Sequence, residues 1–218
     1  FEYFKKHNNE PAAEHALEQI NKLKALPNML LYIDQIMNEG RLGVAELKCR
    51  EFLKKNPTHT YAMSQLSEIA NRLGHFDDAE LLLEKAVQFK PKDGELRMKY
   101  ALVLRKKQKF AKTMEQVNIL CDMYPNNLAY QAQKASEIMQ NGDHEDAINL
   151  FDDILAKNPH NFSTYTSKGH AEKTLGRSSD AIKSYQSAYK IRPDHGEAFF
   201  SLANLKTYSF SEPELTNM

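Results

Sequence analysis

Amphipathic stretches of similar length recur along the chain, and each ends at a proline. The clearest is GHFDDAELLLEKAVQFKP at 74–91, which has the pattern of a turn, a helix with one apolar face and a proline that stops it. Similar stretches occupy 40–57, 142–159 and 176–193, and a more divergent one, QKFAKTMEQVNILCDMYP, occupies 108–125. The closing prolines follow one another at intervals of 34 residues: Pro57, Pro91, Pro125, Pro159 and Pro193. This fixed period predicts an all-α array of helical repeats.

Each repeat has the residues of a helical hairpin when its proline is placed at position 32 of a 34-residue unit. Position 20 is small in every unit, and position 8 is small in most, which lets two helices approach closely. A larger side chain there would overpack the contact at a cost of about 1–3 kcal/mol. Position 15 suits the left-handed conformation that ends a first helix, since it is glycine in all units but one. It is occupied by Gly40, Gly74, Gln108, Gly142 and Gly176.

These positions resemble the tetratricopeptide repeat, with small residues at 8 and 20, a bulky residue at 24 and proline at 32. The resemblance covers 26–195 and implies an all-α, right-handed superhelical solenoid of antiparallel helix hairpins. The third repeat lacks both the Gly of position 15 and the Ala of position 20. In later first helices, Lys134 and Lys168 stand at position 7, which is usually apolar, and Glu172 stands at the aromatic position 11. We therefore expect looser packing of those first helices.

The repeat frame divides the chain into four parts. Residues 1–25 are expected to form an N-terminal capping helix or a partial repeat, and 26–195 to form five repeats. Residues 196–210 have the pattern of the first helix of a sixth repeat. Residues 211–218 are expected to begin a further helix, with Ser211 and Glu214 as its capping box. The chain is therefore expected to be part of a longer protein.

The end of the chain carries a second resemblance. The sequence SLANLKT at 201–207 and the helix start Phe210–Ser211–Glu212 resemble the joint between a tetratricopeptide array and a sulfotransferase domain in certain bacterial proteins. The resemblance implies a catalytic domain downstream, and it assigns no donor-binding residue to this chain.

Composition argues against several classes of partner. Lys+Arg and Asp+Glu number 29 each, so the formal net charge is zero and the chain lacks the positive field that nucleic acid or anionic membranes attract. No apolar run of membrane-spanning length occurs, and 1–11 lack the apolar core of a signal peptide. Cys49 and Cys121 fall on second helices and are expected to be buried free thiols. A reducing compartment follows, namely the cytoplasm, and we expect a bacterial one.

No motif in the sequence indicates catalysis. Glycine-rich phosphate loops, nucleophile elbows and paired metal ligands are absent, so we expect no enzymatic activity, no cofactor and no metal site in this chain. Five histidines fall at turns and are expected to be solvated: His59, His75, His144, His160 and His195.

The resemblance implies that a ligand would bind in a concave groove lined by positions 2, 5, 9, 12 and 13 of the first helices. Leu30 with Met37, and Met98 with Leu102 and Met139, are expected to form apolar patches there, beside a basic group. The candidate groove residues are Tyr61, Glu68, Arg72, Met98, Leu102, Arg105, Lys106, Met139 and His170. Such a groove suits an extended or helical peptide with apolar anchors and an acidic residue. The alternative is that these apolar side chains only pack between repeats and the charges are merely solvated.

The function predicted from the sequence is a protein-binding or peptide-binding scaffold. A chaperone-type carboxylate clamp is not expected, because it needs Lys at position 5 and Asn at position 9 of one repeat. One alternative is the non-catalytic arm of a larger sulfotransferase, which would present substrate or dimerise. Another is a spacer or self-association module, in which case a homodimer is expected.

Overall fold

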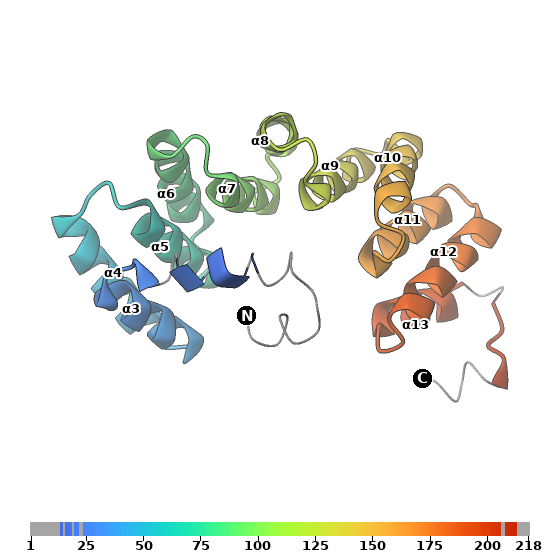
Figure 1. Ribbon diagram of the computed structural model, residues 1–218, viewed down its shortest axis with the longest axis horizontal. Helices are drawn as coiled ribbons and strands as arrows, with labels where there is room; N and C mark the ends of the chain where they lie inside the picture. The colour runs from blue at the N-terminus through green and yellow to red at the C-terminus, as the bar shows by residue number, and fades with distance from the viewer. Residues whose placement is uncertain (1–13, 15, 19, 22–23, 206–207, 213–218) are drawn as a thin grey trace. The chain divides into compact units, whose positions relative to one another are not determined.

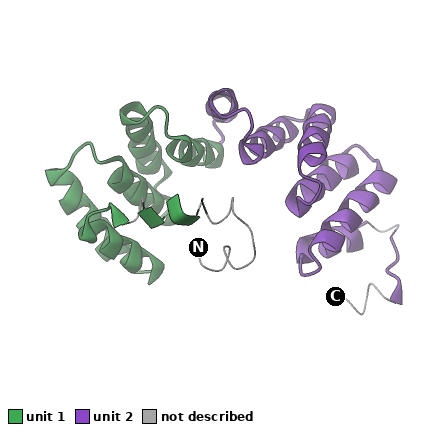
Figure 2. Ribbon diagram, viewed as in Figure 1, with its two compact units in different colours: residues 1–107 green, residues 108–218 purple. Residues whose placement is uncertain are grey.

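The computed structural model describes residues 14, 16–18, 20–21, 24–205 and 208–212, and the regular elements of this part of the chain are all helices (Figure 1). The chain divides into two compact units, residues 1–107 and residues 108–218 (Figure 2). Each unit is built from antiparallel helix pairs joined by short turns.

The first unit contains two helix pairs and one further first helix. Its helices are α3 (Asn28–Asn38), α4 (Leu42–Lys55), α5 (Thr60–Arg72), α6 (Phe76–Phe89) and α7 (Gly94–Lys106). Ala45 on α4 and Ala79 on α6 are completely buried, as expected for position 20. One core cluster joins α3, α4 and α5, and a second joins α5, α6 and α7, so α5 contributes to both.

The second unit begins with a second helix and then continues the same alternation. Its helices are α8 (Phe110–Met123), α9 (Leu128–Gln140), α10 (His144–Lys157), α11 (Phe162–Thr174), α12 (Ser178–Ile191) and α13 (Gly196–Ala203). Phe151 and Tyr185, both at position 24, are among its largest buried side chains. Tyr208 and Phe210 pack onto the cluster formed by α12 and α13, where Gln186 Nε2 donates to the Tyr208 hydroxyl at 3.0 Å. Glu214, the second residue of the predicted capping box, lies outside the described residues.

The turns inside the hairpins have the predicted left-handed backbone. Gly40, Gly74, Gly142 and Gly176 have φ values of 77°, 81°, 97° and 76°. Gln108 stands at the equivalent place and adopts φ 56°. The backbone requirement of position 15 is therefore met even where the glycine is missing, and a side chain is held in a conformation that L-residues disfavour.

The turns between hairpins carry side chains that cap the next first helix. His59, Asp93 and Asn161 each accept a hydrogen bond from the backbone N–H three residues later, and Asn127 accepts from the N–H groups two and three residues later. The prediction that the turn histidines are only solvated is therefore wrong for His59. It is also wrong for His195, whose Nε2 lies 2.9 Å from Thr166 Oγ1, because sequence position does not show which neighbour a turn side chain meets.

The two cysteines differ in burial. Cys49 on α4 is completely buried and its Sγ donates to the carbonyl of Ala62 at 3.2 Å, while Cys121 on α8 is only partly buried. Burial raises the pKa of the Cys49 thiol to about 12. Both are free thiols, and Cys49 is the inert, buried kind that was expected.

Glu172 is buried although it carries a charge in a position that is aromatic in the family pattern. Its carboxylate accepts from Ser184 Oγ at 2.7 Å and lies 3.6 Å from Lys168 Nζ, which in turn lies 2.5 Å from Asp152. Burial raises the pKa of Glu172, and the Ser184 hydrogen bond opposes this effect. The departures at Lys168 and Glu172 thus occur together and compensate each other within one network.

Candidate functional site

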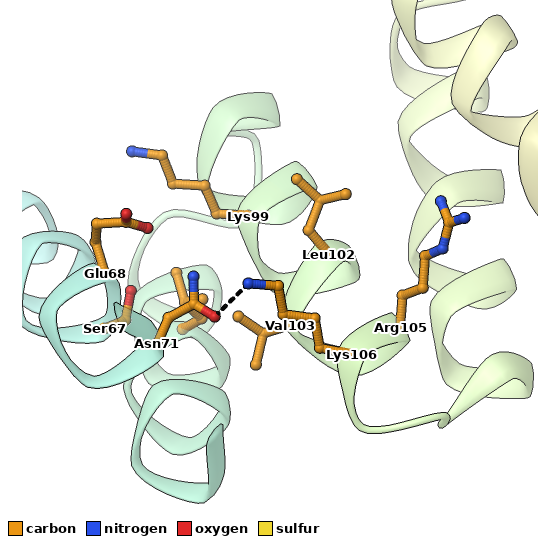
Figure 3. Close-up of a pocket in the computed structure, with 9 residues that line it drawn as sticks. Ser67, Glu68, Asn71, Lys99, Leu102, Val103, Arg105 and Lys106 are labelled. Atoms are coloured by element: carbon orange, nitrogen blue, oxygen red, sulfur yellow. Dashed lines mark hydrogen bonds between the residues drawn. The ribbon is translucent and has the colours of Figure 1, made fainter. Parts of the chain in front are cut away.

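A hollow of about 470 Å³ lies between α5 and α7 in the first unit (Figure 3). Both are first helices, and Leu83 of α6 also lines the hollow. The lining residues are Ser67, Glu68, Asn71, Leu83, Lys99, Leu102, Val103, Arg105 and Lys106. The structure therefore brings together four of the predicted groove residues: Glu68, Leu102, Arg105 and Lys106.

The hollow has an apolar base and a polar rim. Leu83 and Val103 are buried beneath it, whereas Leu102 keeps 42% of its surface exposed. Because an exposed leucine stands over buried apolar side chains, this part of the hollow offers a dry contact to an apolar ligand group.

Lys106 stands at the rim and reaches back to the neighbouring helix. Its Nζ donates to the Asn71 Oδ1 at 2.8 Å and lies 5.7 Å from the centre of the Phe76 ring (Figure 3). The amide oxygen and the aromatic face both attract the ammonium without cancelling its charge. The guanidinium of Arg105, by contrast, points away from Asn71 (Figure 3).

Two cations beside the hollow form ion pairs. Arg72 Nε lies 2.8 Å from Glu68, and Lys99 Nζ lies 3.1 Å from Glu95. Exposed pairs of this kind contribute little to stability, typically about 0–1 kcal/mol each. They do lower the net charge that a ligand meets at these residues.

Among the described residues of the first unit, four side-chain hydrogen bonds join first helices at a constant separation of 35 residues. Gln65 donates to the Leu30 carbonyl, Arg72 to the Met37 carbonyl, Lys99 to Ser64 Oγ and Lys106 to Asn71. The separation is one more than the repeat because helical side chains lean toward the N-terminus of their helix. We refer to these four bonds as the back-links.

Comparison with known proteins agrees with this architecture. The family model described as tetratricopeptide repeat matches residues 133–195. A search of curated protein sequences found no match. Among solved structures, YrrB, described as a TPR protein with an unusual peptide-binding site, is 18% identical with a TM-score of 0.62, over 86% of this chain and 96% of YrrB. TTC0263, a thermophilic TPR protein of Thermus thermophilus, is 17% identical with a TM-score of 0.65, over 83% of this chain and 98% of TTC0263. MamA is 16% identical with a TM-score of 0.65, over 76% of this chain and 96% of MamA.

The fold is that of the tetratricopeptide repeat proteins. The comparisons concern the repeats alone, so the sulfotransferase resemblance stays a prediction from the sequence.

Several predicted groove residues of the tetratricopeptide array have structural contacts instead. Leu30 is completely buried and Met37 nearly so, so the prediction that they form an apolar patch in the groove is wrong. The Tyr61 hydroxyl donates to Asp34 Oδ2 at 2.6 Å, and Gln65 Nε2 donates to Asp34 Oδ1 at 2.6 Å. Burial is the main cause of the raised pKa of Tyr61, and the hydrogen bond to Asp34 raises it further.

The remaining predicted residues lie outside the hollow. Met98 on α7 is partly buried. In the second unit, Met139 packs against the core cluster around Phe151. His170 lies with Nδ1 3.0 Å from the Tyr185 hydroxyl and Nε2 3.3 Å from Glu197 Oε1.

In the described part of the chain, no three His, Cys, Asp or Glu side chains are grouped so that they could hold a metal ion. None of the helices in these residues has the length and apolarity needed to cross a membrane.

Sequence reasoning missed part of the lining. Ser67, Leu83, Lys99 and Val103 line the hollow at positions that were not expected to face a ligand, and Asn71 was expected to line the groove without being singled out as a binding residue. Lys99 and Asn71 could have been found by looking for polar residues that stand 35 positions apart. Lys99 bonds to Ser64 and Lys106 bonds to Asn71 at this separation.

Proposed function

We propose that this chain is a scaffold that binds a protein or peptide, and that the hollow between α5 and α7 is a contact site for an extended or helical segment of that partner. The observation that carries the proposal is the hollow itself, in which exposed Leu102 stands beside the Lys106 ammonium over an apolar base. The scaffold works by binding and performs no chemistry of its own.

The size and composition of the hollow support this proposal. A volume of about 470 Å³ is large enough for one or two ligand side chains, and binding sites commonly combine an apolar lining with a few polar groups. YrrB, which shares the fold, is described as having a peptide-binding site, although its place on that protein does not locate one here.

The structure narrows the set of residues that we propose as contacts. Glu68, Leu102 and Lys106 are proposed to touch the ligand. Arg72 and Tyr61 are proposed to hold neighbouring helices together, because each bonds to the preceding repeat. Neither the sulfotransferase arm nor self-association is supported by any residue of the hollow.

Peptide display tests the proposal directly. A library of random peptides is selected against the whole chain, and the affinity of the enriched peptides is measured by fluorescence polarisation for the wild type and for Leu102→Asp. We expect Leu102→Asp to weaken binding at least about tenfold, because a charge replaces the apolar contact. The matched control is Leu81→Asp, at a leucine on α6 that is 51% exposed and does not line the hollow.

Thermal unfolding of both variants shows whether they remain folded. Failure to enrich any peptide would contradict the proposal, as would equal affinity of the two variants.

A further inference from the structure

Lys106 differs from Arg72, Lys99 and Lys107 in what holds it. Arg72 is paired with Glu68, Lys99 with Glu95, and Lys107 with Asp77 and Glu80. Among the residues that the structure describes, no carboxylate lies within ion-pair distance of Lys106; its contacts are the Asn71 amide oxygen and the Phe76 ring. Its positive charge is therefore positioned but not neutralised.

The neutral contacts also leave hydrogen-bonding capacity. An ammonium has three donors, and the bond to Asn71 uses one of them. Because Asn71 and Phe76 restrict the position of the ammonium, an anion that binds it loses less side-chain entropy than it would on a freely moving lysine.

The surroundings of Lys106 determine which anion fits. Leu102 lies one helical turn before it on the same face of α7, so an apolar contact and a cation stand side by side. Arg72 and Glu68 neutralise each other beside the same hollow, so this pair adds no net positive charge for a group with several negative charges, such as a phosphate chain. A ligand group with one negative charge on an apolar body meets both conditions.

We infer that the hollow binds a peptide carboxylate at Lys106, with a neighbouring apolar side chain of the peptide on Leu102. This inference rests on the proposed function and names the chemistry of its ligand. The carboxylate belongs either to a Glu or Asp side chain or to the C-terminus of the peptide, and both sources offer the same charge-assisted hydrogen bond to the ammonium.

Four pools of octapeptides, each labelled with the same uncharged fluorophore, separate these sources. Every pool has random Leu, Phe, Ser and Gly at seven positions, and the fifth position is either Glu or Gln. Each of these two forms is made with a free or an amidated C-terminus. Binding of each pool is measured for the wild type, for Lys106→Gln, and for Lys54→Gln, which removes an exposed lysine from α4 on the same unit.

We expect at least one carboxylate-bearing pool to bind the wild type about fivefold to tenfold more tightly than the Gln pool with an amidated end. A preference for Glu assigns the side chain, and a preference for the free end assigns the C-terminus. The preference should disappear in Lys106→Gln, persist in Lys54→Gln and weaken as salt is raised.

The failures of the two proposals are distinguishable. If all four pools bind equally, or if the preference survives in Lys106→Gln, the carboxylate inference is overturned while the scaffold function stands. If no pool binds the wild type, the proposed function fails and the inference fails with it. A thermal melt of Lys106→Gln confirms that its unit is folded.

Discussion

The ring of Tyr185 occupies the space in which a side chain at Gly169 would begin. A Cβ added to Gly169 would lie 2.6 Å from Cε1 of Tyr185 and 2.8 Å from Cδ1. Tyr185 is completely buried, and its hydroxyl lies 3.0 Å from His170 Nδ1, so the ring has no free direction in which to move. Position 8 is glycine in this repeat because position 24 is tyrosine.

We expect Gly169→Ala to destabilise the second unit by about 1–2 kcal/mol. Overpacking costs about 1–3 kcal/mol, and the better helix propensity of alanine returns up to about 1 kcal/mol. Urea unfolding measures the change. The matched control is Gly196→Ala at the start of α13, where nothing lies within 4 Å of the added Cβ and the substitution should be neutral or stabilising. A Gly169→Ala variant as stable as the wild type would show that the Tyr185 ring moves freely.

Replacing Gln108 by glycine should have the opposite effect and stabilise the protein. Because Gln108 adopts φ 56°, replacing it by glycine should remove a conformational cost of about 1–2 kcal/mol. The greater freedom of glycine in the unfolded chain offsets part of that gain, so we expect a net stabilisation of up to about 1 kcal/mol. A higher urea midpoint for Gln108→Gly checks this. The reverse exchange, Gly74→Gln at φ 81°, should lower the midpoint, and a null result for both would mean that position 15 is not strained.

The fold follows from the sequence because it depends on a period. Prolines at intervals of 34 and small residues such as Ala45 and Ala79 act through local backbone and close packing, which are alike in every repeat. Gln108 shows how strongly the repeat period determines the backbone. It has the left-handed conformation of position 15 although it is not a glycine.

The site follows from the sequence only in part, because exposure depends on what each neighbour fills. Leu30 and Met98 both stand at position 5, yet Leu30 is buried in its cluster and Met98 is only partly covered. The repeat frame assigns both to the groove and cannot separate them. The link from Lys106 to Asn71 depends on two particular side chains of suitable length, and the period alone does not contain that information.

We expect the stability of the first unit to depend on pH because of the helix cap made by His59. Its Nδ1 accepts from the N–H of Ala62 at 3.3 Å, which requires the neutral ring, and burial lowers the pKa of His59. A histidine whose pKa is lowered by folding contributes its full stability above its unfolded pKa of about 6.5, and that stability is lost as pH falls through the folded value. The first unit should therefore unfold more easily below about pH 6.5.

The variant His59→Asn tests this cap. Asn127 and Asn161 cap the equivalent helices with a side chain that does not titrate, so His59→Asn should remove that pH dependence. At low pH we expect it to be more stable than the wild type by about 0.5–1 kcal/mol, as measured by urea unfolding at several pH values. His75→Asn is the control, because His75 makes no side-chain cap to α6. An unchanged pH profile in His59→Asn would assign the dependence to another group.

Two of the four back-links join α5 and α7, the first helices that line the hollow, which has a mechanical consequence. Bending the first unit so that α5 and α7 separate lengthens the bonds from Lys99 to Ser64 and from Lys106 to Asn71. The stiffness of this unit is therefore set partly by side chains that a bound ligand would touch. The coupling is reciprocal. A ligand that favours one spacing of the two helices opposes bending by the same free energy by which bending weakens the binding of that ligand.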